Sequence, residues 1–276
     1  MPELPEVESV LRALCDARPS LIGRQIQQVL VTWDGVLCEC SVTDFHKQLM
    51  GAMFSTASRH GKYLFFRLDG EGFPCNKRKY LVVHLRMTGR LALVQESESH
   101  GRHTRLALTL DHNLALCFDD PRKFGRVWLV DDPGQVTTKL GPDALAVAYG
   151  LFAERFETYH RQLKPLLLDQ SFVSGIGNIY ADEVLYRAGF HPLTNSAHLS
   201  PLEIRRLYDA VNSVLREAVA TKGANIDGVF KAGMFRVNVY ARQGQSCFFC
   251  GSTIIKTRVG QRGTHFCPVC QILKSH

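Results

Sequence analysis

The chain has 276 residues, 45% hydrophobic side chains and a formal net charge of +7, which is typical of a globular protein with about two domains. It has no apolar run of about 18 residues, which excludes a transmembrane helix, and the opening MPELPEVESV lacks the basic and apolar regions of a secretory signal. We therefore expect a cytoplasmic protein with no membrane partner.

The first half of the chain is predicted to be a leading helix followed by a β-sandwich. Residues 6–16 have apolar side chains at helical spacing, and Pro5 suits the first helical position, so residues 2–4 are expected to lie outside this helix. From about residue 25 to 130, short apolar or alternating runs are separated by Gly, Asp and Asn, as in the strands of a sandwich. Residues 111–113 are predicted to form a hairpin turn.

Residues 140–222 are predicted to be helical. Ser200-Pro201-Leu202-Glu203 has the form of a capping box, and Gly223 is placed to end the helix that follows. A second helix is predicted over Ile179–Ala188, with Gly189 as its end. The turn before it, residues 174–178, has two glycines and leads into a helix N-terminus, where exposed N–H groups bind phosphates. A plain helix cap is the alternative interpretation.

Four cysteines near the end of the chain indicate a metal site. Cys247, Cys250, Cys267 and Cys270 form two Cys-x2-Cys knuckles separated by 16 residues, a spacing that suits four thiolates around one tetrahedral Zn²⁺. Four protein ligands leave no position for water, so the zinc is expected to be structural. A redox role is the alternative. Between the knuckles Arg262 is predicted at a hairpin tip, where its guanidinium can reach a phosphate.

The other five cysteines are scattered, and no role is predicted for them. In a chain without an export signal they do not form a disulfide framework.

The basic residues are concentrated at the C-terminal end. Residues 222–276 contain eight Lys and Arg and one Asp, which accounts for the whole net charge of +7. A basic region of this density suits a polyanionic partner, of which nucleic acid is the commonest. A solvated basic tail is the alternative interpretation.

Pro2 is the residue with the most specific chemistry. The initiator methionine is usually removed before a small residue, and this would expose a secondary amine at Pro2. An α-amino group has a pKa near about 8, so a useful fraction is unprotonated at neutral pH. Such an amine can attack a sugar C1′ and form an iminium ion, with Glu3 and Glu6 as proton donor and orienting carboxylate. Taken alone, a proline at position 2 is more often only the start of a chain.

Six segments, in order along almost the whole chain, resemble the formamidopyrimidine-DNA glycosylase family. They are MPELPEVESV, His60-Gly61-Lys62, LRMTGRL at 85–91, DPRKFGR at 120–126, SGIGNIYADE at 174–183 and the terminal CxxC…QRGTHFCPVC. The resemblance implies an α+β multidomain fold. Its parts are an N-terminal β-sandwich with a leading helix (residues 1–138), a helix–two-turn–helix domain (139–232) and a β-hairpin zinc finger (233–276).

The resemblance also implies catalytic roles. Pro2 matches the nucleophile, and Glu3 matches the general acid/base that assists ring opening and elimination. Lys62 matches the lysine near the phosphate of the damaged nucleotide, and Glu6 matches a supporting carboxylate.

Five further residues match contacts to DNA. Asn178 and Arg262 resemble two phosphate contacts, one from the helix–two-turn–helix and one from the finger. Met87, Arg122 and Phe124 resemble a trio that fills the space left by an extruded base, where Met and Phe give apolar contact and Arg bonds the unpaired partner. Taken singly, these three resemble two core residues and a solvated charge.

The implied function is base excision repair. The enzyme would be a bifunctional DNA glycosylase and lyase that removes oxidised purines, such as 8-oxoguanine and formamidopyrimidines, through a Schiff base and β,δ-elimination. Its partner would be double-stranded DNA with a damaged base or an abasic site. We expect a bacterial, cytoplasmic monomer that holds one structural Zn²⁺ and needs no redox cofactor.

Two alternatives remain. Residues 222–240 resemble a shortened loop, and residues 233–247 and 166–172 resemble the endonuclease VIII branch, which removes oxidised pyrimidines. The opening PELPEVES and the complete Met87, Arg122 and Phe124 trio favour the purine branch. The alternative from another class is a non-catalytic zinc-finger protein that binds damaged DNA, which the intact catalytic residues argue against.

Overall fold

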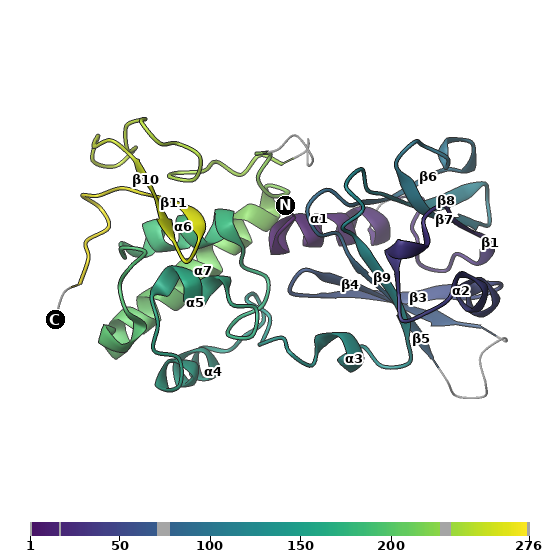
Figure 1. Ribbon diagram of the computed structural model, residues 1–276, viewed down its shortest axis with the longest axis horizontal. Helices are drawn as coiled ribbons and strands as arrows, with labels where there is room; N and C mark the ends of the chain where they lie inside the picture. Colours follow the sequence, from purple (N-terminus) through teal and green to yellow (C-terminus); the bar gives the residue numbers. More distant parts are fainter. Residues whose placement is uncertain (1, 17, 71–77, 227–232, 275–276) are drawn as a thin grey trace. The chain divides into compact units, whose positions relative to one another are not determined.

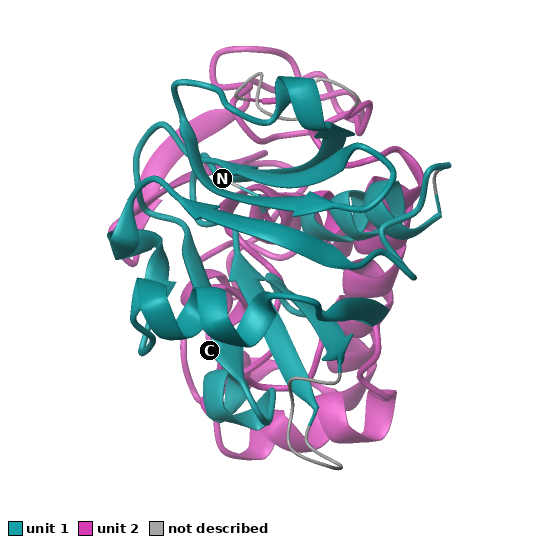
Figure 2. Ribbon diagram, turned by 90° about the vertical axis from the view of Figure 1, so that its right-hand side faces the viewer, with its two compact units in different colours: residues 1–2, 7–138 teal, residues 3–6, 139–276 magenta. Residues whose placement is uncertain are grey.

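The computed structural model describes residues 2–16, 18–70, 78–226 and 233–274. The chain divides into two compact units, which Figure 2 shows in different colours. Unit 1 comprises Met1–Pro2 and Val7–Thr138, and unit 2 comprises Glu3–Glu6 and Lys139–His276. Four residues from the start of the chain therefore belong to the same unit as its C-terminal half. Within the described ranges, no helix is long and apolar enough to cross a membrane.

Two β-sheets make up most of unit 1 (Figure 1). Among the described residues, one sheet has the antiparallel order β1-β7-β8-β6. The other has the order β2-β9-β5-β4-β3, in which the two-residue strand β2 is parallel to β9. The strands are β1 (Ile26–Val31), β2 (Leu37–Cys38), β3 (Met53–His60), β4 (Tyr63–Asp69), β5 (Lys79–His84), β6 (Arg90–Gln95), β7 (Thr104–Leu110), β8 (Leu114–Asp119) and β9 (Arg126–Val130). The predicted N-terminal β-sandwich is confirmed.

The predicted hairpin turn at residues 111–113 joins β7 to β8. Leu110 pairs with Leu114 across the turn. His112 and Asn113 have φ angles of 60° and 57°, in the left-handed region that Asn tolerates better than most residues. The turn is therefore confirmed in the position that the sequence predicted.

The helices of unit 1 differ from the prediction in two places. The leading helix α1 spans Leu4–Cys15, so Leu4 lies inside it and Pro5 is its second residue. This is possible because the N–H groups of the whole first turn have no intrahelical partner, and proline costs nothing there. Within the region read as β, residues 42–49 form a helix, α2 (Val42–Leu49). Its N-cap is Ser41, whose side chain accepts a hydrogen bond from the N–H of Asp44. The prediction used only the spacing of apolar residues and therefore missed this helix.

The short helix α3 (Gly134–Thr137) follows β9. Single-turn 3₁₀ segments also occur in both units, over Asp34–Val36, Glu96–Glu98, Arg155–Glu157 and Ser196–His198.

Unit 2 is helical up to the finger, as predicted. Its helices are α4 (Tyr149–Glu154), α5 (Leu163–Leu168), α6 (Asn178–Ala188) and α7 (Pro201–Ala220). Helix α6 ends at Gly189, which has a φ of 70°, and the capping box of Ser200 and Glu203 starts α7. Helix α7 ends at Ala220, earlier than Gly223 suggested, and the N–H of Gly223 donates to the carbonyl of Ala218.

Within its described residues, the finger contains one hairpin, formed by β10 (Ile255–Val259) and β11 (Arg262–Phe266). Its two-residue turn is Gly260 and Gln261, both with positive φ, as the twist of a tight hairpin requires. The sequence suggested that Arg262 lies at the tip of the turn, and this is wrong. Arg262 is the first residue of β11, directly after the turn.

A single apolar cluster joins the N-terminal segment to the helices of unit 2. Leu4 is fully buried among side chains that include Ile176 of the turn before α6, Val184 of α6 and Leu215 of α7. The Leu4 N–H donates to the carbonyl of Gly175 over 3.1 Å. These contacts fix the residues on either side of Leu4, which are the candidate catalytic ones.

Candidate active site

Glu3 lies across the N-terminus of α6. Its buried carboxylate accepts hydrogen bonds from the backbone N–H groups of Gly177 (2.8 Å), Ile179 (2.9 Å) and Tyr180 (3.3 Å). Free N–H groups and the helix dipole favour an anion at this place. The sequence predicted a phosphate here, and that interpretation is wrong for these three N–H groups because a side-chain carboxylate already occupies them.

Gly175 and Gly177 of this turn leave room for the N-terminal segment. A Cβ on Gly177 would lie 2.3 Å from Cδ of Glu3, and one on Gly175 would lie 2.5 Å from Cδ1 of Leu4. Gly175 also has a φ of +111°, which L side chains rarely adopt. The glycines therefore allow the N-terminal segment, and not a ligand, to approach the backbone closely.

Glu6 is the second buried carboxylate of this corner. One of its oxygens accepts from the N–H of Glu3 (2.9 Å), and the other accepts from the hydroxyl of Tyr180 (2.5 Å) and the N–H of Ala224 (2.8 Å). Burial and the nearby charge of Glu3 raise the pKa of Glu6 to about 7, against the opposing effect of its three hydrogen bonds. Glu6 can therefore take up or release a proton near neutral pH.

Pro2 directly precedes Glu3 and is buried. Residue 1 lies outside the described residues. The chain connection alone holds the backbone nitrogen of Pro2 close to the anchored backbone of Glu3. A secondary amine at this position would have a fixed carboxylate as its neighbour in sequence.

Lys62 belongs to unit 1, where it follows Gly61 in the turn between β3 and β4. It is largely buried, with 8% of its surface exposed. Nearby, burial together with the positive charges of Arg86 and Lys62 lowers the pKa of His84 to about 3, so His84 stays neutral at physiological pH. Lys62 and Arg86 thus both place a positive charge close to His84 in unit 1.

Met87, Arg122 and Phe124 lie on two loops of unit 1, and all three side chains are exposed. The guanidinium of Arg122 lies over the Phe124 ring, 4.7 Å from its centroid. Both loops are held by the buried carboxylate of Asp120. It accepts from the hydroxyl of Thr88 and from the backbone N–H groups of residues 122, 124 and 125, over 2.5–3.2 Å. The structure thus brings together the loops of the trio, and Asp120 is what connects them.

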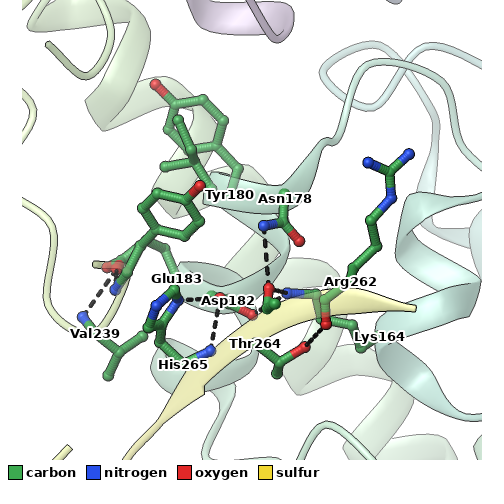
Figure 3. Close-up of polar contacts among 12 residues, drawn as sticks. Lys164, Asn178, Tyr180, Asp182, Glu183, Val239, Arg262, Thr264 and His265 are labelled. Carbon is green, nitrogen blue, oxygen red and sulfur yellow. Dashed lines mark hydrogen bonds and ion pairs between the residues drawn. The ribbon is translucent and has the colours of Figure 1, made fainter. Parts of the chain in front are cut away.

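Asn178 and Arg262 are brought together by the carbonyl of Gly263 in unit 2. Asn178 is the first residue of α6, and its Nδ2 donates to that carbonyl over 3.1 Å. Arg262 directly precedes Gly263, is exposed, and has no hydrogen-bond or ion-pair partner for its guanidinium within the described ranges. Figure 3 shows this guanidinium extending away from the buried polar contacts beneath the hairpin.

The four cysteines converge in unit 2 and fit a zinc ion. Their sulfur atoms lie within 4.8 Å of one another, with 3.8 Å between Cys247 and Cys270 and 3.4 Å between Cys250 and Cys267. Zinc–sulfur bonds of about 2.3 Å in a tetrahedron place sulfurs about 3.8 Å apart. The finger therefore holds one structural Zn²⁺.

Sequence reasoning missed the residues that hold the others in place. Tyr180, Asp120 and Asp182 lie inside the very segments that carried the resemblance, next to residues that were assigned a role. The sequence carries such a signal for Tyr180, a polar residue between the apolar Ile179 and Ala181 in a segment expected to be buried, because such a residue needs a partner. Asp120 and Asp182 have polar or charged neighbours and carry no comparable signal.

Comparison with known proteins agrees with this arrangement along the whole chain. Residues 1–127 match the family model for the formamidopyrimidine-DNA glycosylase N-terminal domain, residues 140–228 that for its H2TH domain, and residues 244–272 that for a zinc finger found in FPG and IleRS. The formamidopyrimidine-DNA glycosylases of Chloroflexus aurantiacus and Enterococcus faecalis are 41% and 38% identical to this chain, over 99% of it and 98% of each relative.

Solved structures give the same result. The Lactococcus lactis Fpg in complex with DNA that contains an abasic site has a TM-score of 0.87 and 32% identity, covering 98% of this chain and 99% of that one. The same values hold for MutM in complex with DNA that contains a carbocyclic 8-oxo-G. The chain is thus an α+β protein that belongs to the formamidopyrimidine-DNA glycosylase family.

Proposed function

We propose that this protein is a base-excision-repair enzyme that removes oxidised purines from double-stranded DNA and then cleaves the strand, with Pro2 as its nucleophile. The observation that carries the proposal is the anchoring of Glu3 by three N–H groups of the α6 N-terminus, directly after Pro2. Catalysis by the amine of Pro2 requires an acid/base group fixed beside it, whereas DNA binding alone does not. The relatives are named formamidopyrimidine-DNA glycosylases, and a solved neighbour holds an 8-oxo-G analogue in DNA, which supports purine lesions.

The reaction begins when the unprotonated amine of Pro2 attacks C1′ of the damaged nucleotide. The bond between C1′ and the base breaks, and the base leaves with the bonding electrons and takes up a proton, so that Pro2 is bonded to C1′. Glu3 accepts the N–H proton of Pro2 and passes it to the ring oxygen O4′ as the C1′–O4′ bond breaks, and this ring opening forms the iminium ion. The iminium then acidifies the C2′ proton, and its loss expels the 3′ phosphate. A second elimination expels the 5′ phosphate.

Glu6 supports this chemistry through its hydrogen bond to the backbone of Glu3. Its pKa of about 7 makes it a proton store at neutral pH, and its bond to the N–H of Glu3 fixes the backbone next to the nucleophile. We assign it to positioning and proton supply and not to direct contact with the sugar.

The remaining residues recognise DNA in this proposal. Lys62, Asn178 and Arg262 contact phosphates of the damaged strand, and Met87, Arg122 and Phe124 enter the space left by the extruded base. The zinc ion is structural and takes no part in the reaction.

The same proposal covers the organisation and location of the protein. The catalytic sandwich comprises residues 1–138, the helix–two-turn–helix domain residues 139–232 and the finger residues 233–276. The protein acts as a monomer in the cytoplasm, in keeping with relatives from bacteria.

The alternative of an endonuclease VIII-like enzyme rests on the loop 223–235, and residues 227–232 of it lie outside the described residues. A comparison of substrates separates the two branches. We expect faster nicking of a duplex with 8-oxoguanine opposite cytosine than of one with thymine glycol. Faster cleavage of thymine glycol would assign the protein to the pyrimidine branch.

The covalent mechanism is tested by borohydride trapping on the 8-oxoguanine duplex. The wild-type chain should give a covalent complex, and Pro2→Gly should reduce its yield at least about 100-fold, because the secondary amine is lost. Pro5→Ala, a change of proline in the same segment, is the control and should trap normally. A trapped complex that survives Pro2→Gly, or active protein that retains its initiator methionine, would contradict the mechanism.

A further inference from the structure

A buried charged cluster lies beneath the zinc-finger hairpin, outside the residues that the proposed reaction uses. Asp182 of α6 forms an ion pair with Lys164 of α5, and both side chains are completely buried. The other Asp182 oxygen accepts from the backbone N–H of His265 (2.9 Å) and from the Nδ1–H of its ring (3.2 Å). Figure 3 shows Asp182 between Lys164 and His265.

The contacts of this cluster end on the backbone of β11. Lys164 donates to the carbonyl of Gly263 over 3.3 Å, and the same carbonyl accepts from Asn178. Together with the N–H of His265, these bonds fix β11 at positions one and three residues after Arg262. The Arg262 side chain extends away from the cluster (Figure 3), so the cluster holds its backbone and leaves its guanidinium available.

The chemistry of the cluster is poorly suited to stability alone. Removing a lysine and an aspartate from water is costly, and apolar residues of similar volume usually serve a core at least as well. An ion pair whose remaining hydrogen-bonding atoms are all directed at one strand instead fixes the direction and register of that strand. The adjacent buried acid, Glu183, behaves differently, because its partners are the N–H groups of residues 238–240.

We propose that Asp182 is a positioning residue for DNA binding, which acts through β11 to hold Arg262 where it meets a phosphate of the damaged strand. Lys164 and His265 are its partners in this role. The inference rests on the proposed function, since it takes Arg262 to be a phosphate contact.

A double-mutant cycle between Asp182 and Arg262 tests the proposal on the full-length, zinc-loaded protein. Asp182→Asn should raise KM for an 8-oxoguanine duplex by about tenfold with kcat nearly unchanged, the signature of lost ground-state binding. The slope of log affinity against log salt should become less steep by about one phosphate contact. In an Arg262→Ala background, Asp182→Asn should change KM by less than about twofold, because the side chain through which Asp182 affects DNA binding has already been removed.

Two controls keep the result interpretable. Glu183→Gln removes a neighbouring buried charge that does not contact β11, so any effect it has should be the same with and without Arg262. Should Asp182→Asn lose its zinc or unfold, the neutral pair Lys164→Gln/Asp182→Asn, which leaves no uncompensated buried charge, is measured in its place. It should show a smaller loss of affinity that likewise vanishes in the Arg262→Ala background.

The outcomes separate this inference from the proposed function. A wild-type protein that neither nicks nor is trapped on the lesion duplex overturns the function. An active wild type in which Asp182→Asn leaves KM and the salt slope unchanged, or weakens binding equally in both backgrounds, overturns the positioning role of Asp182 alone.

Discussion

Asp120 in unit 1 and Asp182 in unit 2 are both buried aspartates that hold loops or strands carrying exposed DNA-contact candidates, yet they do so by different means. The groups that donate hydrogen bonds to the Asp120 carboxylate are neutral, namely one hydroxyl and three backbone N–H groups. Asp182 is paired with the fully buried cation of Lys164 in addition to its bonds to β11.

Because of this difference, the trio of Met87, Arg122 and Phe124 and the candidate phosphate contact Arg262 are expected to respond differently to mutation. The loops of Met87, Arg122 and Phe124 depend on one carboxylate that organises its own neighbourhood, because its backbone partners lie within five residues. The position of Arg262 depends on residues up to about 100 positions apart in the sequence and on a hairpin within the zinc finger. A mutation in unit 1 should therefore affect only the loops next to it. The position of Arg262 in unit 2 should also be lost when the zinc finger is disturbed.

The largest expected effect is that of removing zinc. Because small metal-bound domains take about 10 kcal/mol or more of their folding free energy from the metal, chelation should unfold residues 244–272 and weaken DNA binding about 100-fold or more. Hydrogen exchange, followed strand by strand, is the measurement. β10 and β11 should lose protection from exchange, while β7 and β8 keep theirs. A parallel loss in β7 and β8 would contradict the expectation that unit 1 does not depend on the zinc.

A smaller effect is expected from Asp120→Ala. Four donors lose their buried acceptor, which should cost unit 1 about 3–5 kcal/mol and reduce excision of 8-oxoguanine about 100-fold. Cleavage of a preformed abasic site should suffer less, since no base has to be extruded there. Asp119→Ala, next to it in the chain, is the matched control, because Asp119 accepts mainly from the hydroxyl of Thr104. Equal losses for the two variants would count against Asp120 as the residue that holds both loops.

The smallest effect is a difference in pH dependence. The pKa of His84 is about 3 in the folded state against 6.5, so the unfolded chain binds the extra proton and unit 1 loses stability as pH falls below 6.5. The pKa of Glu6 is about 7 against 4.5, so the folded state binds the extra proton and unit 2 loses stability as pH rises from 4.5 to 7.

Between pH 5 and 6 the two effects should each amount to about 1.2 kcal/mol, with opposite signs. Urea unfolding measures them separately, because both tryptophans, Trp33 and Trp128, belong to unit 1 and hydrogen exchange can follow unit 2. His84→Asn and Glu6→Gln should each flatten the slope of their own unit. Slopes of the same sign in the two units would show that other groups dominate.

Much of the fold could be predicted from local sequence patterns. The hairpin at residues 111–113, the capping box at Ser200 and the four zinc cysteines are all defined by residues that lie close together in the chain. Helix α2 was missed because its signal is a cap and not an apolar stripe. The start of α1 was misplaced because proline is tolerated anywhere in the first turn.

The candidate site could be predicted only in part. The resemblance named Pro2, Glu3, Lys62 and the DNA-contact residues, and their roles remain predictions. It gave no indication that the phosphate-like position at α6 is occupied by Glu3, since the bond from Ile179 to Glu3 spans 176 residues. Contacts of that kind have no local periodicity, so the partners of Tyr180 and Asp182, and the bond between Asp120 and Thr88, emerged only from the three-dimensional structure.

The assignment of Glu3–Glu6 to unit 2 has a consequence for how the protein is made. These residues are translated well before their partners at positions 175–180 and 224. A nascent chain can build the sheets of unit 1 as they emerge, whereas the corner around Glu3 has to wait for most of the polypeptide. Strand-cleaving capacity would thus arise only in chains whose synthesis has passed α7, and prematurely terminated products would be inert.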